Sequence, residues 1–162
     1  MSGVVRLRDR ATADDRSVVH DLVVATGVFR PNEVPVAIEV LDARLSRGPV
    51  SGYEFLFAEN DTEVVGYACY GYNEMTASSW ELYWIAVYPH LQGQGIGRAL
   101  MDEVHRRVAA AGGERICLDT SGKPIYDPTR AFYQANGYRE VARLPDYYGP
   151  GDDKVIFQRD LP

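Results

Sequence analysis

The sequence predicts one α/β domain built on a mixed β-sheet, and three observations support this fold class. The chain has 162 residues, a length that suits a single domain with its own core, and no repeat, linker or low-complexity stretch divides residues 1–162. The apolar periodicity switches between that of helices and that of strands, which gives the order β-α-α-β-β-β-α-β-α-β-β. A helix joins the fourth and fifth strands, so these two strands should run parallel.

The first third of the chain should contain a short strand over residues 4–8 and two helices. The first helix should run to residue 26, because Thr12 can cap it and acidic residues follow at 14–15. The second helix should span residues 32–47. The side chains expected to face the core are Val18, Leu22, Val23 and Ala25 in the first helix and Val36, Val40, Leu41 and Leu45 in the second.

The remaining elements follow from alternating apolar residues and from the turn residues between them. Strands are expected over residues 53–59, 64–72, 80–87, 115–119, 138–144 and 154–158, and helices from the glycine-rich loop to residue 111 and over residues 129–135. A polar loop over residues 146–153 should join the last two strands.

Composition excludes several classes of function. Hydrophobic residues make up 46% of the chain and charged residues 25%, which is ordinary for a globular protein. No apolar run approaches the roughly 20 residues of a membrane helix, and the segment 1–6 lacks the apolar centre of a signal peptide, so we expect a soluble, cytoplasmic protein that does not bind membranes. The net charge of -6 disfavours nucleic acid as a partner.

The cysteines and histidines give no sign of a metal site. Cys69 and Cys117 are each embedded in a strand-like apolar run, so we interpret both as small core residues. His20, His90 and His105 lack the spacing of metal ligands, and no metal is predicted.

The most informative segment is the glycine-rich loop over residues 87–101. A strand that feeds a helix through a loop with few side chains can bind phosphate, because the ligand approaches bare backbone and the first amides of a helix are unpaired donors. Gly93, Gly95 and Gly97 suit such an approach, although a flexible turn is the simpler alternative. The spacing matches neither a Walker A motif, which ends in Gly-Lys-Ser/Thr, nor the dinucleotide fingerprint G-x-G-x-x-G.

Three ordered segments resemble the GCN5-related N-acetyltransferase (GNAT) superfamily. The Gln92-x-x-Gly95-x-Gly97 pattern is similar to the Q/R-x-x-G-x-G/A loop that holds the pyrophosphate of acetyl-coenzyme A in that superfamily. Residues 81–87 resemble its fourth strand, and residues 131–138 resemble its A-x-Y-x-x-x-G-F/Y segment. The resemblance covers residues 63–144 well and the N-terminal third only loosely.

The resemblance implies the GNAT fold: a mixed, mostly antiparallel sheet of about seven strands, splayed in a V between strands 4 and 5 and flanked by four helices. It also implies acetyl-CoA as the acetyl donor, with the pantetheine arm lying in the splay. The residues that it places against acetyl-CoA are Ile85, Ala86, Val87, Gln92, Gly93, Gln94, Gly95, Ile96, Gly97 and Ala99. Arg98 and Arg130 are candidate partners for the phosphates because a guanidinium matches phosphate oxygens in a bidentate way, and solvated helix charges are the alternative for both.

Acetyl transfer to an amine requires a base for the ammonium and a proton for the leaving thiolate. By resemblance, Tyr133 is the candidate acid and Glu81 the candidate base, while Asp119 competes with Glu81 for the second role. Simple packing of Tyr133 and an exposed carboxylate at Glu81 are the structural alternatives. Many family members have an asparagine seven residues before the tyrosine, where it contacts the pantetheine. This chain has Tyr126 at that position, so its contact with the pantetheine must differ there.

The function predicted from these residues is transfer of an acetyl group from acetyl-CoA to a primary amine by direct attack in a ternary complex. The acceptor is a small amine, an amino-acid-like molecule or a peptide N-terminus. Residues expected to surround it are Phe29, Tyr70, Tyr72, Tyr83, Tyr147 and Tyr148, with Glu33, Glu74 or Asp152 nearby. The alternative is a non-catalytic regulatory module that binds acyl-CoA, and a homodimer is left open. A third alternative, a nicotinamide-dependent oxidoreductase, is disfavoured by the glycine spacing.

Overall fold

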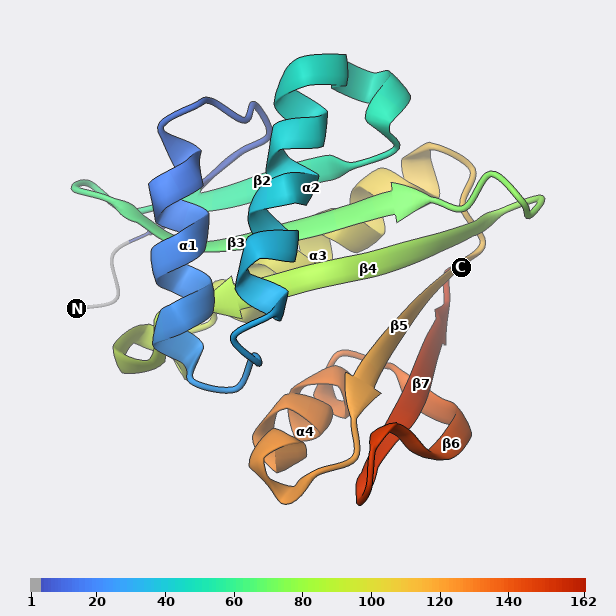
Figure 1. Cartoon of the computed structure of the whole chain (residues 1–162). Coiled ribbons are helices and arrows are strands. Elements are labelled where there is room, and N and C mark those ends of the chain that lie inside the picture. The colour runs from blue at the N-terminus through green and yellow to red at the C-terminus, as the bar shows by residue number, and fades with distance from the viewer. Residues whose placement is uncertain (1–3) are drawn as a thin grey trace.

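A seven-stranded mixed sheet with the strand order β1-β2-β3-β4-β5-β7-β6 organises the chain (Figure 1). The computed structural model describes residues 4–162. The strands are β1 (Arg6–Arg8), β2 (Glu54–Glu59), β3 (Val64–Tyr72), β4 (Ser79–Val87), β5 (Arg115–Ser121), β6 (Arg139–Gly149) and β7 (Asp152–Asp160). The helices are α1 (Asp15–Thr26), α2 (Glu33–Arg47), α3 (Ile96–Ala110) and α4 (Asp127–Ala135), with short 3₁₀ turns at Gly48–Ser51, Pro89–Leu91 and Pro124–Tyr126. The predicted fold class and order of elements are confirmed.

The fourth and fifth strands pair only at one end and then separate. They run parallel, as their connection through α3 requires, and pair at Ser79 with Arg115, Trp80 with Ile116 and Glu81 with Cys117. Beyond these three pairs β4 stays bonded to β3, whereas β5 stays bonded to β7. Figure 1 shows the resulting V between β4 and β5, with α4 beside its open end.

Helices cover the two faces of the sheet. The helices α1 and α2 pack on one face, where the core contains Leu22, Leu41 and Phe57. The other face packs against α3, and its core contains Leu100, Val104 and Phe157. The strand β4 contributes Leu82 and Val87 to one core and Ala86 to the other, so it stays packed on both faces beyond the point where it leaves β5.

Three predictions about the N-terminal helices were wrong in detail. In α1 the side chain of Ala25 is exposed, while Val19 is buried. The helix α1 begins at Asp15, and Thr12 does not cap it with its side chain; instead the Asp15 carboxylate accepts hydrogen bonds from the amide of Thr12 at 2.7 Å and from Arg8. In α2 the side chains of Val36 and Leu45 are exposed, while Ala37 is buried in their place. The sequence of α2 has apolar residues on several faces, so periodicity alone did not fix its orientation.

The last two strands are longer than predicted, because side chains stabilise a tight turn between them. Asp146 has a φ of 53°, and its carboxylate accepts a hydrogen bond from the amide of Gly151 at 2.8 Å. In return the amide of Asp146 donates to the carboxylate of Asp153 at 2.9 Å. The segment predicted as a polar loop is thus mostly strand.

Two further observations bear on the sequence predictions. No helix within residues 4–162 is long and apolar enough to cross a membrane. Residues 1–3, which belong to the segment tested for a signal peptide, lie outside the described residues. Both cysteines are free thiols; Cys69 is buried in the core and Cys117 is half-buried.

Candidate active site

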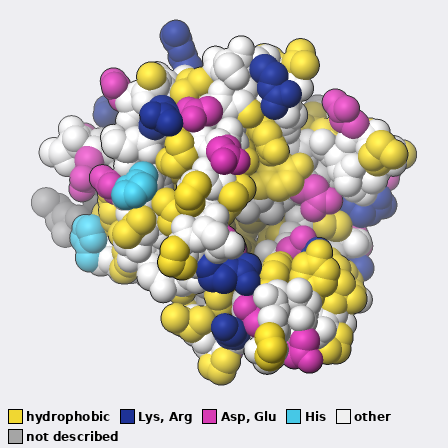
Figure 2. All heavy atoms as spheres, viewed as in Figure 1, with side chains coloured by type: hydrophobic (Ala, Val, Ile, Leu, Met, Phe, Trp, Pro, Cys, Tyr) yellow, Lys and Arg dark blue, Asp and Glu magenta, His cyan; other side chains and the backbone are white. Residues whose placement is uncertain are grey.

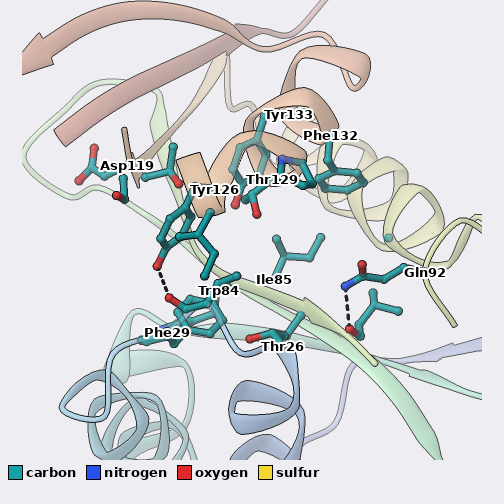
Figure 3. Close-up of a pocket in the computed structure, with 18 of the residues that line it drawn as sticks. Thr26, Phe29, Trp84, Ile85, Gln92, Asp119, Tyr126, Thr129, Phe132 and Tyr133 are labelled. Carbon is teal, nitrogen blue, oxygen red and sulfur yellow. Dashed lines mark hydrogen bonds between the residues drawn. The ribbon is translucent and has the colours of Figure 1, made fainter. Parts of the chain in front are cut away.

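The separation of β4 and β5 opens a cavity of about 970 Å³. Its walls come from the α1–α2 connection, the end of β4, the glycine-rich loop, the end of β5, α4 and the β6–β7 turn. Figure 2 shows the surface hollowed between the half that carries α2 and the half that carries α4, with acidic and basic side chains at the rim. In Figure 3 the side chains of Ile85 and Trp84 face those of Tyr133 and Tyr126 across this cavity.

The glycine-rich loop presents backbone to one end of the cavity. Gly93 and Gly95 have φ angles of 81° and 86°, which favour glycine, and a Cβ on either would meet nothing within 4 Å. Gly95 stands at the N-cap of α3, so the first amides of that helix face the same space. This open cradle, which side chains would fill, fits a phosphate group.

The other members of the loop have distinct positions. Gln92 lines the cavity and donates its Nε2–H to the carbonyl oxygen of Val87 at 3.3 Å, which ties the loop to the end of β4 (Figure 3). A Cβ on Gly97 would lie 3.1 Å from the ring of Phe132, so this glycine allows α3 to approach α4. Gln94 and Ala99 are not among the described residues that line the cavity, and the amide of Ala99 is already bonded to Gly95 within the helix.

The edge of β4 is available along the second wall. Its backbone pairing with β5 ends at Glu81, and Ile85, Ala86 and Val87 line the cavity beyond that point. An exposed strand edge offers amide and carbonyl groups that an extended ligand can pair with. All three residues expected to supply this edge line the cavity.

The two arginines predicted as phosphate partners differ in position. Arg98 lines the cavity; its side chain is 74% exposed and meets Asp102 only at 3.8 Å, so its guanidinium can turn toward an anion. Arg130 points instead into the β5–α4 connection, where it donates to the carbonyl oxygen of Lys123 at 3.1 Å and pairs with Asp127. It holds that turn in place, and its predicted contact with a phosphate requires a different rotamer.

Tyr133 lies between the core and the cavity. Its ring packs against Tyr138 and Phe157 at centroid distances of 6.1 and 6.0 Å, and it also lines the cavity beside Thr129 (Figure 3). Burial raises its pKa well above the usual range for tyrosine. The phenol therefore keeps its proton at neutral pH.

Two carboxylates flank the closed end of the V. Glu81 occupies the last paired position of β4, opposite Cys117, and Asp119 follows two residues later on the same face of β5. Burial raises the pKa of Glu81, and the negative charge of Asp119 raises it further, while a 3.5 Å hydrogen bond from Asn73 opposes the shift. Asp119 lines the cavity and is ion-paired with Lys154 at 3.2 Å. Glu81 is not among the described residues that line the cavity, so it does not contact that space directly.

The aromatic surroundings differ from the predicted set. Phe29, Tyr83 and Tyr148 line the cavity, as expected. Tyr70 instead belongs to the core under α3, and Tyr72 is exposed and bonded to its own turn. Tyr147 and Glu74 are exposed and are not among the described residues that line the cavity, so these four predictions were wrong. The sequence analysis missed Trp84, which lines the cavity and whose ring lies 5.1 Å from that of Phe29. No sequence signal marks it, because the residue at which β4 leaves β5 is set by packing.

Tyr126 lines the cavity and forms a hydrogen bond to a distant part of the chain. Its hydroxyl donates a 2.7 Å hydrogen bond to the carbonyl oxygen of Val28, in the α1–α2 connection (Figure 3). Burial raises the pKa of this phenol to about 12, so it remains a donor over the whole physiological range. The residue that replaces the asparagine of the family pattern thus connects two walls of the cavity.

No group of three or more histidine, cysteine, aspartate or glutamate side chains within residues 4–162 is arranged to hold a metal ion.

Comparisons with known proteins agree with this geometry. Residues 51–140 match the model of the acetyltransferase (GNAT) domain. An uncharacterised N-acetyltransferase of Methanocaldococcus jannaschii is 30% identical over 109 residues, which is 67% of each chain. The crystal structure of a GNAT-family protein from Desulfovibrio desulfuricans is 42% identical, with a TM-score of 0.95 over 98% of this chain and 100% of that one.

A more distant structure shares the fold. The PaiA N-acetyltransferase of Thermoplasma acidophilum, solved with coenzyme A, is 16% identical and has a TM-score of 0.75 over 97% of this chain and 99% of that one. The family match, which covers more than half of the chain, agrees with the glycine-rich loop and the splayed strands. The chain belongs to the GNAT superfamily of N-acetyltransferases.

Proposed function

We propose that this protein transfers an acetyl group from acetyl-CoA to a primary amine, by direct attack of the amine in a ternary complex. One observation carries the proposal: the open amides at the start of α3, the free edge of β4 and the phenol of Tyr133 all face one cavity. The fold shared with a coenzyme A complex supports the same donor.

Bound acetyl-CoA would supply an activated acetyl group as a thioester. The amides of the loop from Gly93 to Gly97 would hold its phosphates at the positive end of the α3 dipole. The backbone of Ile85 to Val87 would hold the pantetheine arm by adding hydrogen bonds to the strand edge. These contacts fix the position of the thioester relative to the side chains described next.

Glu81 is the proposed base. An alkyl ammonium has a pKa of about 10.4, so the amine must lose a proton before it attacks at neutral pH. The raised pKa of the Glu81 carboxylate makes it a stronger base than an exposed glutamate. Asp119 is the second candidate, because it lines the cavity directly. Either carboxylate can accept the proton of the amine through a water molecule.

Tyr133 is the proposed acid. It carries a proton at neutral pH and reaches the cavity from α4, so it can donate to the sulfur as negative charge develops there. A phenol with a raised pKa donates a hydrogen bond more readily than it gives up the proton. Its contribution is therefore expected to lie mainly in stabilising the departing thiolate.

Thiol release from acetyl-CoA, measured with a panel of primary amines, tests the proposal directly. Equilibrium binding of acetyl-CoA and of NADH serves as the companion measurement. We expect micromolar binding of acetyl-CoA, none of NADH and amine-dependent thiol release. Tight binding of acetyl-CoA without thiol release for any amine would favour the regulatory module instead.

A further inference from the structure

Two cations from distant parts of the chain converge on one buried carboxylate in the cavity wall. Asp152, at the start of β7, has a side chain that is only 8% exposed. The guanidinium of Arg30, from the α1–α2 connection, approaches its Oδ2 at 3.7 Å, and the ammonium of Lys123, from the β5–α4 connection, approaches the same oxygen at 3.8 Å. All three residues line the cavity, on the side away from the glycine-rich loop.

The carboxylates of this region are satisfied. Asp152 accepts a short hydrogen bond from the hydroxyl of Ser121 through its Oδ1. Glu33 accepts the backbone amide of Arg30 at 2.6 Å. Asp119 is paired with Lys154 at 3.2 Å. A cationic group of a ligand would therefore compete with partners that these carboxylates already have.

The side chains of Arg30 and Lys123 still have N–H groups that can donate to a ligand. Arg30 has five N–H donors, but its guanidinium meets Glu33 only at 3.4 Å and Asp152 only at 3.7 Å. Within residues 4–162 Asp152 is the one carboxylate recorded near the ammonium of Lys123, and it lies beyond hydrogen-bond distance. The side chains of Arg30 and Lys123 are 42% and 50% exposed. What this part of the cavity can still bind is an anion.

Neighbouring residues hold the two cations in position. The guanidinium of Arg30 lies over the ring of Tyr148, with its Cζ 4.9 Å from the centroid. The hydrogen bond from Tyr126 to Val28 fixes the segment that carries Arg30 against the turn that carries Lys123. Asp152 keeps both cations close together despite their mutual repulsion. A preorganised pair of this kind loses little entropy when it binds a ligand.

We propose that the acceptor of this enzyme is an amino acid or a close analogue, whose carboxylate binds between Arg30 and Lys123 while its amine faces the thioester. The inference rests on the proposed acetyl transfer and names the substrate class for the same cavity. A peptide N-terminus lacks that carboxylate, and a polyamine would bring a second positive charge to the two cations. The apolar rings of Phe29 and Trp84, which also line the cavity, offer a surface for the side chain of the amino acid.

Matched acceptors test the proposal. The activity is measured as kcat/KM for free amino acids, for the corresponding amino acid amides and for the decarboxylated amines, with wild-type protein and with Arg30→Gln and Lys123→Gln. Loss of a charge-assisted contact should lower kcat/KM for the free amino acids by about 10- to 100-fold. The values for the amides and amines should change less than about threefold. Because each acceptor is compared with itself, differences in amine basicity cancel.

Two controls separate this inference from its alternatives. Arg16→Gln removes from α1 a guanidinium that forms an exposed ion pair with Asp42 of α2, and it should leave kcat/KM unchanged for both acceptor classes. Acetyl-CoA affinity should be unchanged in Arg30→Gln; a matching loss of that affinity would show that the cations serve the donor, and would overturn the proposal. Equal losses for acids and amides would overturn it as well, while thiol release itself would still support acetyl transfer.

Binding of the acetylated products tests the anion site even without turnover. Isothermal titration in the presence of coenzyme A compares N-acetyl amino acids with their amides. We expect binding of the carboxylate form, weakened about 10-fold or more in Arg30→Gln, and weaker binding of the amide. Equal binding of the two forms, or binding of neither, would reject the proposal.

Discussion

The phenol of Tyr126 and the carbonyl oxygen of Val28 are joined by a 2.7 Å hydrogen bond across 98 residues of sequence. The bond connects two walls of the cavity that opens between β4 and β5, because it joins the α1–α2 connection to the turn before α4. The proposed acceptor side of the cavity is thus held by a contact that does not involve the sheet. Its removal should affect the acceptor more than the donor.

Tyr126→Phe is therefore expected to raise the KM for the acceptor several-fold while the affinity for acetyl-CoA stays the same. The lost hydrogen bond should lower the free energy of unfolding by about 1 kcal/mol. Steady-state kinetics and denaturant unfolding measure the two effects. Tyr147→Phe is the control, because Tyr147 is 57% exposed and its ring keeps its contact with Lys154. An unchanged acceptor KM in Tyr126→Phe would show that the bond does not shape the site.

The donor site is tested by placing a carboxylate in the glycine-rich loop. Gly95→Glu should abolish measurable binding of acetyl-CoA, because a side chain and a negative charge would stand where the phosphates meet the amides. The substitution also strains the backbone, since Gly95 has a φ of 86°.

Gly112→Glu controls for that strain. Gly112 lies just beyond the other end of α3, has a φ of 84° and, like Gly95, has nothing within 4 Å of an added Cβ. Both variants should lose a similar free energy of unfolding, and only Gly95→Glu should lose binding in isothermal titration. If both bind acetyl-CoA as the wild type does, the loop does not hold the phosphates.

The backbone geometry of the proposed donor side was predictable from sequence, and the reason is local. The path of the loop is set by Gly93 and Gly95, whose positive φ angles are encoded by residue type, and the start of α3 follows directly. Tyr133 could be placed beside it only through the family resemblance, because its distance from the loop depends on how α4 packs. The structure confirms that α4 brings this phenol to the same cavity.

The acceptor side could not be predicted in the same way. Arg30, Lys123 and Asp152 come from three connections that meet only after the sheet is assembled, and no spacing within the sequence relates them. The relative access of Glu81 and Asp119 depends on the residue at which β4 and β5 stop pairing. Such a point is set by packing on both faces of the sheet, which periodicity does not report.

The pH dependence of Glu81→Gln tests the base. If Glu81 removes the proton of the amine, the variant should lose most of its rate near neutral pH and recover at alkaline pH, where the free amine is abundant. The stability of the folded chain should also depend on pH through Glu81. Because burial raises the pKa of Glu81 in the folded chain, its contribution to stability is present at low pH and is lost as the pH rises through that raised value. Glu81→Gln should therefore raise the Tm relative to wild type at pH 8 more than at pH 4.

Asp119→Asn decides between the two carboxylates. A rate loss that is confined to neutral pH in Asp119→Asn, together with a nearly wild-type profile in Glu81→Gln, would reassign the base to Asp119. Glu74→Gln changes an exposed carboxylate in the β3–β4 turn and should leave the profile unchanged. A loss that is uniform across pH in Glu81→Gln would mark Glu81 as structural.

Tyr133→Phe tests the acid and separates an enzyme from a binding module. The substitution keeps the ring, and thus its packing on Tyr138 and Phe157, while it deletes the hydroxyl that faces the cavity. Binding of acetyl-CoA should change little, because the loop and the strand edge supply it. The turnover number should fall by about 10²-fold, the lower end for general acid catalysis, because a thiolate leaves tolerably well without a proton.

Tyr138→Phe is the matched control for this last prediction. The hydroxyl of Tyr138 is bonded to the buried His105 at 2.9 Å, away from the cavity, so its loss should cost about 1–3 kcal/mol of stability without a comparable loss of turnover. Stopped-flow measurement of thiol release separates the chemical step from product release. If Tyr133→Phe released thiol at the wild-type rate in that step, Tyr133 would be a packing residue, and the proton for the sulfur would have to come from water.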